Sequence, residues 1–510
     1  MACPLVAVLG GIAGRPFGRW DGVLVTGMEV DSRRIAPGDL FVALPGLRAA
    51  GGDFVADALA RGAGSLVLPD GRPAPPGIPG LHAADPRAAL ALAADAVYDR
   101  PSQALQVVGV TGSNGKTTVT AMLAHLLAAA GRPTGYWTTN EVRSPVRRFR
   151  PALTTPEAHD LQRFLRECLV GGSTHACVEV SSHAVVQRRI LGVRFAAGII
   201  TGVAPDHIDF HGSFANYLAA KAAFLESLIP PAPCFYNLDD PGARRAVARV
   251  RTATVSYGFA EDADIRAIGP WVGEHAAGCA VRLAPRWLTT LPMAAHTIAP
   301  LRLTIPVPGR HNLQNALAAL GAGIAMGVPA EQAATSLAAF QPVARRLRLQ
   351  RAGGCTVIDD VAMNGASVDA VLSTVAELSY PQVVVVVALR GNRGADANAR
   401  LAAALARWDR RLHFAPVIAS LSRAALARYP LDYQVRPEEG DAFARTAAAS
   451  GLVSEIHTEL ADAIRRGCAR LDPGAALLLL GTFGMDEGAA LAAHLLGGEA
   501  GMLHPPPSFG

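Results

Sequence analysis

Short apolar runs of strand length alternate along this chain with segments in which apolar residues return at helical spacing. The clearest example is residues 105–110, an apolar run rich in β-branched side chains, followed by a glycine turn over residues 112–115. Apolar residues then recur at helical spacing over residues 119–127, and Gly131 and Pro133 predict the end of that helix. This order of strand, turn and helix predicts an α/β unit with a mostly parallel sheet.

Breaks between the apolar runs predict three domains. A Gly/Pro-rich stretch at residues 71–80 and a proline at position 101 precede the strand-turn-helix pattern, which predicts a boundary near residue 100. Further strand-like runs lie at residues 176–180, 197–201, 356–358, 383–389 and 477–480. The predicted fold class is α/β, with domains at residues 1–100, 101–342 and 343–500 and a disordered tail at 501–510. We expect a doubly wound, mostly parallel sheet in the central domain and a Rossmann-like third domain.

Composition narrows the possible functions. The net charge of +5 in 510 residues comes without a dense Lys/Arg run, so nucleic acid is not an expected partner. The seven cysteines are widely spaced, which favours a reduced compartment and argues against structural zinc. The apolar opening is too short to span a membrane and the other apolar runs have strand length, so we expect a cytoplasmic protein without a membrane partner.

The strongest single motif is GVTGSNGKTT at residues 109–118. Glycines let backbone N–H groups close around phosphate oxygens, Lys116 can reach the terminal phosphates, and Thr117 can ligate Mg²⁺. The spacing matches a short GxxGK[ST] form rather than GxxxxGK[ST]. A glycine-rich turn that only caps a helix would leave Lys116 and Thr117 unexplained. The predicted nucleotide contacts in this loop are Gly112, Ser113, Asn114, Gly115, Lys116, Thr117 and Thr118.

This loop resembles the ATP loop of the Mur ligases, and further motifs resemble that family in the same order. Asp31-Ser32-Arg33 and residues 37–49 are similar to the domain that holds the uridine nucleotide in MurE-type members. The central-domain matches are Thr154-Thr155-Pro156 and residues 178–183, 206–212, 217–221, 237–241 and 309–315. Together the motifs cover most of residues 25–345.

The resemblance implies an ATP-dependent ligase that joins an amino acid to a UDP-N-acetylmuramoyl peptide through an acyl-phosphate, in peptidoglycan precursor synthesis. It implies ATP and two Mg²⁺ ions as cofactors, a UDP-muramoyl peptide and an amino acid as substrates, and a monomer. Phosphorylation gives a carboxylate a better leaving group, and the anionic reactants require cations around the γ-phosphate.

The resemblance also implies the residues that act on the phosphates. The implied metal ligands are Thr117, Glu179, His207 and Lys221, with Lys221 carbamylated by CO₂. The implied catalytic residues are Lys116, His207, Lys221 and Arg346. Taken singly, these residues have plainer interpretations: a buried strand-end carboxylate, a capping or surface histidine, and a helix-surface lysine.

Substrate and nucleotide contacts follow from the same resemblance. Ser32 and Arg48 match positions at the uridine end, and Thr154, Thr155, Ser181, Gln187 and Arg189 match positions that hold the muramoyl peptide. Asn312 and Asn315 match the adenine side, Arg346 the γ-phosphate and Asp360 the ribose. Helix caps and buried, backbone-bonded asparagines are the structural alternatives for these polar residues.

The third domain departs from the family pattern. Arg346 and Asp360 match in register, but the Tyr, His and Pro that follow the family's Asp are replaced in residues 359–365. The two motifs typical of diaminopimelate-adding members are absent from residues 419–423 and 481–487. The acceptor therefore stays open between lysine, another amino acid and a compound outside peptidoglycan, with Arg423 and residues 390–394 as candidate contacts.

Two alternatives to a peptidoglycan ligase remain from the sequence. One is a Mur-type ligase acting on a different carboxylate, and retention of the uridine-type motifs argues against it. The other is a catalytically inactive ATP-binding scaffold, which the substitutions at Met363 and Gly365 favour. Retention of Lys116 and the implied metal ligands argues against the scaffold.

Overall fold

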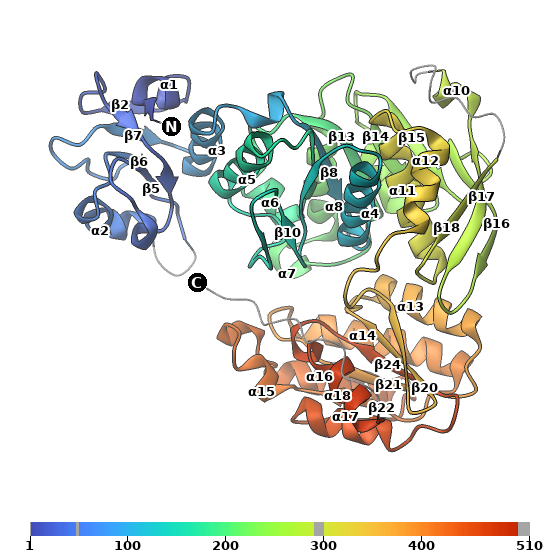
Figure 1. Cartoon of the computed structure of the whole chain (residues 1–510). Helices are drawn as coiled ribbons and strands as arrows, with labels where there is room; N and C mark the ends of the chain where they lie inside the picture. Colours follow the sequence, from blue (N-terminus) through green and yellow to red (C-terminus); the bar gives the residue numbers. More distant parts are fainter. Residues whose placement is uncertain (1, 47–49, 290–299, 498–510) are drawn as a thin grey trace.

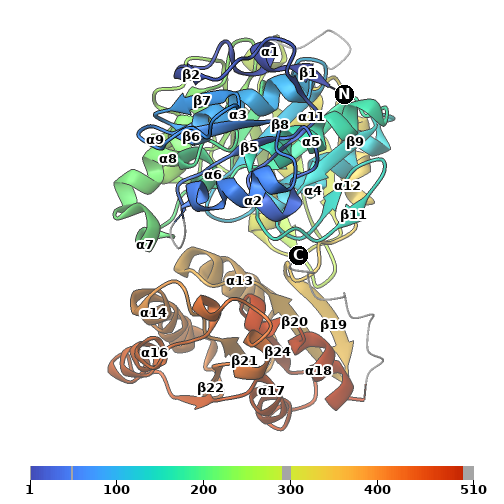
Figure 2. The ribbon, with the colours of Figure 1, turned by 90° about the vertical axis from the view of Figure 1, so that its left-hand side faces the viewer.

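The computed structural model describes residues 2–46, 50–289 and 300–497 as three α/β units. The first two lie side by side, and the third lies below them in both views (Figures 1 and 2). The three-domain α/β fold class is therefore confirmed. The tail predicted to be disordered, residues 501–510, falls outside the described residues.

The first unit has a five-stranded sheet in the order β2-β7-β6-β5-β4, in which only β2 runs antiparallel to its neighbour. Helices α1 and α3 cover one face and α2 the other. A separate ladder joins β1 and β3. The strands are β1 (Cys3–Pro4), β2 (Arg15–Phe17), β3 (Leu24–Val25), β4 (Met28–Glu29), β5 (Leu40–Val42), β6 (Ser65–Pro69) and β7 (Gly80–Ala83). The helices are α1 (Leu5–Leu9), α2 (Val55–Ala60) and α3 (Pro86–Val97), with 3₁₀ turns η1 (Ser32–Arg34), η2 (Gly51–Phe54) and η3 (Pro101–Gln103).

The second unit is built on an eleven-stranded sheet in the order β11-β10-β9-β12-β8-β13-β14-β15-β16-β17-β18. The seven strands from β9 to β16 in this order are parallel, and the two at each edge are antiparallel. The strands are β8 (Gln106–Thr111), β9 (Thr134–Trp137), β10 (Val142–Arg143), β11 (Arg148–Phe149), β12 (His175–Glu179), β13 (Phe195–Ile200), β14 (Cys234–Asn237), β15 (Thr254–Gly258), β16 (Ile265–Val272), β17 (Ala277–Leu283) and β18 (Leu301–Ile305).

Helices cover both faces of this sheet, as the doubly wound pattern requires. Helices α4, α11 and α12 pack on one face, and α5, α6, α8 and α9 pack on the other. The helices are α4 (Lys116–Ala129), α5 (Ala158–Val170), α6 (Ser182–Val186), α7 (Ile208–His211), α8 (Phe214–Glu226), α9 (Pro241–Val247), α10 (Pro285–Leu288), α11 (Arg310–Ala325) and α12 (Ala330–Ala338).

The third unit has a six-stranded sheet in the order β19-β20-β24-β21-β22-β23, parallel except for β19. All of β21 is buried because helices α13, α14 and α16 cover one face and α17 and α18 the other. The strands are β19 (Arg348–Ala352), β20 (Cys355–Asp360), β21 (Val383–Ala388), β22 (Val417–Ser420), β23 (Ser454–His457) and β24 (Ala476–Leu480). The helices are α13 (Gly365–Leu378), α14 (Ala395–Leu412), α15 (Arg423–Leu426), α16 (Pro437–Ala449), α17 (Leu460–Cys468) and α18 (Gly488–Leu495), with 3₁₀ turns η5 (Leu431–Tyr433) and η6 (Phe483–Met485).

The observed strands lie within two residues of the predicted ones, as for β8 against residues 105–110. Helix α4 ends at Ala129, and Gly131 follows with φ +74°, so the glycine stop signal acts as expected. All seven cysteines are free thiols. Within the described ranges, no helix combines the length and apolar content needed to cross a bilayer.

Candidate functional site

The candidate site lies at the carboxyl edge of the central sheet, where β8, β12 and β13 end side by side. The loop from Gly112 to Gly115 joins β8 to the N-terminus of α4, so its N–H groups and the helix dipole face the same space. Gly115 has φ +85°, and a Cβ there would also collide with the side chain of Asn315. The loop therefore requires glycine for its conformation and for close packing.

Two lysines, the only ones in the sequence, converge on this loop. Lys116 donates from Nζ to the carbonyls of Gly112 (2.9 Å) and Ser113 (3.1 Å), and Lys221 donates to the same Gly112 carbonyl at 2.8 Å. Burial lowers the pKa of Lys116, and burial together with Lys116 lowers the pKa of Lys221 well below its ordinary value. No carboxylate of the described chain pairs with either amine, so this end of the loop favours an anion.

Glu179 ends β12 and is fully buried. Its carboxylate accepts hydrogen bonds from the backbone N–H of Thr139 at 2.8 Å and from the hydroxyl of Thr139 at 3.1 Å. Thr117, on the first turn of α4, accepts a hydrogen bond from Nη2 of Arg346 at 3.0 Å. Arg346 belongs to the third unit, so this contact joins the two units directly over the phosphate loop.

His207 follows β13 in a left-handed conformation with φ +52°. Its ring lies 4.7 Å from that of His183, and burial lowers the pKa of His207, which favours the neutral imidazole, whose unprotonated nitrogen can act as a ligand. Asp206 forms an ion pair with Arg393 of the third unit at 2.7 Å. Burial would raise the pKa of Asp206, but the guanidinium of Arg393 brings it below its ordinary value.

The main cleft, of about 500 Å³, lies between the carboxyl edges of the central and third sheets. Thr117, Glu179 and His207 line it, whereas Lys221 lies buried behind the loop. The hydroxyl and carboxylate oxygens fit the preference of Mg²⁺ for hard oxygen ligands, and the imidazole nitrogen of His207 is a less typical ligand for this ion. Among the residues described, no group of three His, Cys, Asp or Glu side chains could hold a metal by itself. A metal here would therefore also need the threonine hydroxyl, substrate phosphates or water.

The residues predicted to hold the muramoyl peptide also line the main cleft: Thr154, Thr155, Ser181, Gln187 and Arg189. The hydroxyl of Thr155 donates to the Glu179 carbonyl at 2.7 Å, and Ser181 caps α6, so both have structural partners. In contrast, Oε1 of Gln187 and Nε of Arg189 are buried and have no hydrogen-bond partner in the described part of the chain. These two atoms can accept and donate to a ligand.

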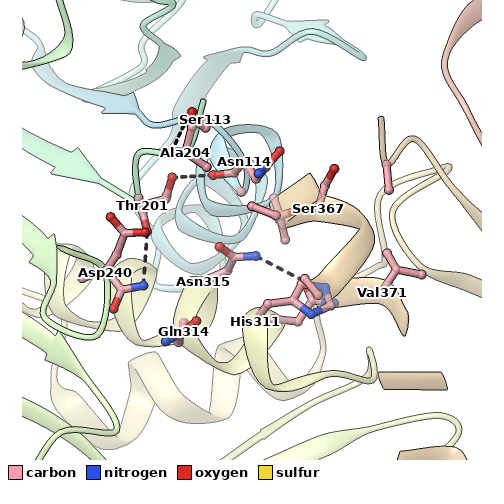
Figure 3. A pocket seen from close by; sticks show the side chains of 18 of the residues that line it. Ser113, Asn114, Thr201, Ala204, Asp240, His311, Gln314, Asn315, Ser367 and Val371 are labelled. Carbon is pink, nitrogen blue, oxygen red and sulfur yellow. Dashed lines mark hydrogen bonds between the residues drawn. The ribbon is translucent and has the colours of Figure 1, made fainter. Parts of the chain in front are cut away.

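An inner cavity of about 220 Å³ opens on the other side of the loop (Figure 3). It is lined by Thr118 and by the predicted adenine-side residues Asn312 and Asn315. Asn312 donates to the Pro308 carbonyl at 2.8 Å. This is the buried, backbone-bonded asparagine that we considered as the alternative to an adenine contact. Asp360 also lines this cavity, accepts from two backbone N–H groups, and has its pKa raised by burial to about 6.

Two further candidates, Ser32 and Arg423, do not line the cleft, and a third, Arg48, is not among the described residues. Ser32 lies in η1 of the first unit, where Asp31 caps the turn, and it borders neither cavity. Arg48 falls outside the described residues. The structure does not support the expectation for Arg423, which lies exposed at the start of α15 and does not line the cleft. Arg390 and Arg393, from the segment after β21, do line it.

Sequence reasoning missed several polar residues of the site. Asp206 directly precedes His207 and belongs to the motif at residues 206–212. Its position in that motif could have marked it as a site residue, and the structure pairs it with Arg393. No sequence signal marks Thr139 or Asn364 as a site residue. Thr139 reaches Glu179 only because strands β9 and β12 are neighbours in the sheet, and Asn364 reaches Asn114, at 3.1 Å, only where the central and third units meet.

The fold and site define a three-domain nucleotide-binding α/β protein with a cleft between its central and third domains. Three consecutive family models match it: "Mur ligase family, catalytic domain" over residues 24–98, "Mur ligase middle domain" over 110–323 and "Mur ligase, glutamate ligase domain" over 345–483. The chain belongs to the Mur ligase family.

Individual relatives agree with this family. The chain is 34% identical over 376 residues to the UDP-N-acetylmuramoyl-L-alanyl-D-glutamate--2,6-diaminopimelate ligase of Geobacter metallireducens, covering 72% of this chain and 71% of that protein. It is 31% identical over 475 residues to the ligase of the same name from Rhizobium meliloti, covering 92% and 91%. The crystal structure of MurF from Acinetobacter baumannii shares the fold, with a TM-score of 0.71, 20% identity and coverage of 98% and 99%.

Proposed function

We propose that this protein is an ADP-forming ligase that adds an amino acid to a UDP-N-acetylmuramoyl peptide, a precursor of peptidoglycan. The observation that carries the proposal is the arrangement of Lys116, Glu179 and His207 around one cleft, which Arg346 reaches from the third unit. The names of the relatives indicate the carboxylate substrate, which is a UDP-N-acetylmuramoyl peptide. Orphaned polar atoms at Gln187 and Arg189 support a polar peptide in the same cleft.

In the first step, an oxygen of the substrate carboxylate bonds to the γ-phosphorus of ATP as the bond to the β-γ bridging oxygen breaks. The products are an acyl-phosphate and ADP. Loop N–H groups, the positive end of α4 and Lys116 stabilise the transferring phosphoryl group. Arg346 is the candidate for a contact from the third unit, because its Nε is buried beside the loop without a protein partner.

In the second step, the amine of the amino acid attacks the acyl carbon and forms the C–N bond. The tetrahedral intermediate then expels inorganic phosphate by breaking the C–O bond, and the nitrogen loses its proton. The cleft holds the two reactants together, which removes much of the entropic cost of a bimolecular reaction.

Bound Mg²⁺ would neutralise the phosphate charge during transfer. Thr117 and Glu179 would hold one ion, and His207 and Lys221 would contribute to a second. Lys221 would do so as a carbamate, in which its neutral amine bonds to the carbon of CO₂ and loses a proton. Burial disfavours the ammonium form of Lys221, which supports this modification. We further propose that the enzyme acts as a monomer in the cytoplasm.

The test is phosphate release from ATP and Mg²⁺ in the presence of UDP-muramoyl-dipeptide, screened over single amino acids. We expect release that requires both the muramoyl substrate and an amino acid. Release without a muramoyl requirement would show a ligase for another carboxylate. Tight ATP binding without turnover under any condition would show a scaffold and overturn the proposal.

A further inference from the structure

The loop after β21 presents a guanidinium that has no anionic partner in the described chain. Arg390 lines the main cleft, and no carboxylate lies within ion-pair distance of it. Its Nε donates only a long hydrogen bond, 3.3 Å, to the amide oxygen of Asn392. Burial and the neighbouring Arg393 lower the pKa of Arg390, and a guanidinium nevertheless stays charged in a protein. An unpaired charge in such a place favours an anionic ligand.

The loop that carries Arg390 is held in place by the rest of the third unit. Asn398 clamps its backbone, donating to the Arg390 carbonyl at 2.9 Å and accepting from its N–H at 3.3 Å. Gly391 packs so tightly against the backbone near Gln434 that a Cβ would collide with it. The N-terminus of the 18-residue helix α14 follows at Ala395 and adds positive potential. Arg390 is therefore positioned before any ligand arrives.

Arg150 of the central unit is a second guanidinium that lines the main cleft, and its charge is only partly neutralised. Arg390 lies over the ring of Phe483, 5.7 Å from its centroid, and Phe483 packs against Tyr429. Tyr429 donates to Asp486, and Arg150 of the central unit reaches that carboxylate only at 3.9 Å. Asp486 is already paired closely with Arg345, so Arg150 keeps much of its charge available.

The third-unit side of the cleft offers no counter-charge to a second amine. Along that wall the described residues include arginines, amides, hydroxyls and aromatic rings but no Asp or Glu. The acidic residues of the cleft, Glu179, Asp206 and Asp209, all come from the central unit, and Asp206 is already paired with Arg393. A distal ammonium in the acceptor would therefore meet like charges, which costs affinity.

We infer that the amino acid accepted by this ligase carries a carboxylate on its side chain and no second amino group, and that Arg390 binds one of its two carboxylates. Arg150 is the candidate for the other. This inference rests on the proposed function and names the acceptor class that the function leaves open. Its amine is the nucleophile of the second step above.

Competition kinetics with UDP-muramoyl-dipeptide test the inference directly. L-glutamate, D-glutamate and L-aspartate are compared with L-lysine, meso-diaminopimelate and L-alanine. We expect at least one dicarboxylic acid to exceed the other three about tenfold or more in kcat/KM. A preference for lysine or diaminopimelate, or alanine as good as glutamate, would overturn the inference while leaving the ligase function intact.

The variant Arg390→Gln identifies the residue responsible. We expect the KM for the dicarboxylic acceptor to rise about 10- to 100-fold while the KM for ATP stays unchanged, because a charge-assisted pair is lost. Arg423→Gln is the matched control, since Arg423 is exposed outside the cleft, and it should leave both constants unchanged. An equal rise in both KM values would contradict a role in acceptor binding.

A binding measurement separates this inference from the proposed function. In the presence of Mg²⁺ and ADP, L-glutamate should raise the melting temperature of the wild-type protein more than L-lysine or L-alanine does, and Arg390→Gln should lose that difference. This result without turnover would sink the ligase function and keep the anion site. Equal shifts for all three amino acids would sink the anion site.

Discussion

The central and third units contribute to the cleft in different ways. On the central side, Glu179, Lys116 and Lys221 all have hydrogen-bond partners within the chain, and the surrounding motifs resemble those of the family. On the third-unit side, Arg390 has no carboxylate partner within the ranges that the structure describes, and the sequence departs from the family's acceptor motifs. From this difference we expect the activation chemistry to depend mainly on the central side, which Arg346 joins from the third unit, and the choice of amine to depend mainly on the loop after β21.

This separation follows from topology. The carboxyl ends of β8, β12 and β13 meet those of β20, β21 and β24 at one cleft, because both sheets are parallel in their centres. Loops at a sheet edge can change sequence without disturbing the core beneath them. Variants of Glu179 and Lys221 should therefore reduce turnover with every acceptor, whereas variants in the loop after β21 should change acceptor affinity.

The largest effect is expected for Lys221→Ala. If the carbamate supplies a metal ligand, its loss should reduce kcat about 10³-fold with every amino acid, and added formate or acetate should restore part of it. Phosphate release measures both. Labelling with ¹³C-bicarbonate should give a carbamate NMR signal that the variant lacks, and Lys116 is the only other lysine. Wild-type turnover in Lys221→Ala would refute the carbamate role.

Glu179→Gln should have the next largest effect. The amide keeps the shape and one acceptor for Thr139 but loses the negative charge, so kcat should fall about 10²-fold and the Mg²⁺ concentration required should rise. Titration of phosphate release with Mg²⁺ measures this shift. Thr139→Val is the comparison, because it removes the hydroxyl contacts to Glu179 and Thr154 but keeps the carboxylate charge, and it should have a smaller effect on the Mg²⁺ requirement. An unchanged Mg²⁺ dependence in Glu179→Gln would argue against metal ligation.

Arg393→Ala should have an intermediate effect confined to the acceptor. It breaks the 2.7 Å pair with Asp206 and leaves that carboxylate available, so the KM for the acceptor should rise about tenfold. Because Asp206 then faces the cleft unpaired, L-lysine should be discriminated against less than in the wild type. Steady-state kinetics with the preferred acid and with lysine give both values. A fall in kcat with no change in acceptor KM would place Arg393 with the activation machinery instead.

The smallest effect is expected for Glu274→Ala, at a contact between the units away from the cleft. Glu274 accepts from Arg351 at 2.7 Å, from Thr356 at 3.1 Å and from Tyr380 at 3.2 Å. Arg351 is more than half exposed, so the pair contributes at most about 1 kcal/mol and kcat should change less than about fivefold. A change in the ratio between amino acids would show that this contact also influences acceptor choice.

The sequence alone determined the elements whose signals are local. The phosphate loop, the burial of β8 and β21, and the stop after α4 all depend on neighbouring residues, on glycine conformations and on apolar runs. Motifs in a fixed order could therefore predict the fold class and a part of the lining of the two cavities, chiefly the phosphate loop and the muramoyl-side residues.

Only the tertiary structure decided which distant residues meet. Nothing local brings Lys221 to the carbonyl of Gly112, Arg346 to Thr117 or Arg393 to Asp206, since each pair depends on how sheets and domains pack. For the same reason residue spacing could not show that Arg423 lies outside the cleft, or that Arg390 lines it with no carboxylate partner among the described residues. Whether a charge has a partner is a property of three-dimensional surroundings, which residue spacing does not encode.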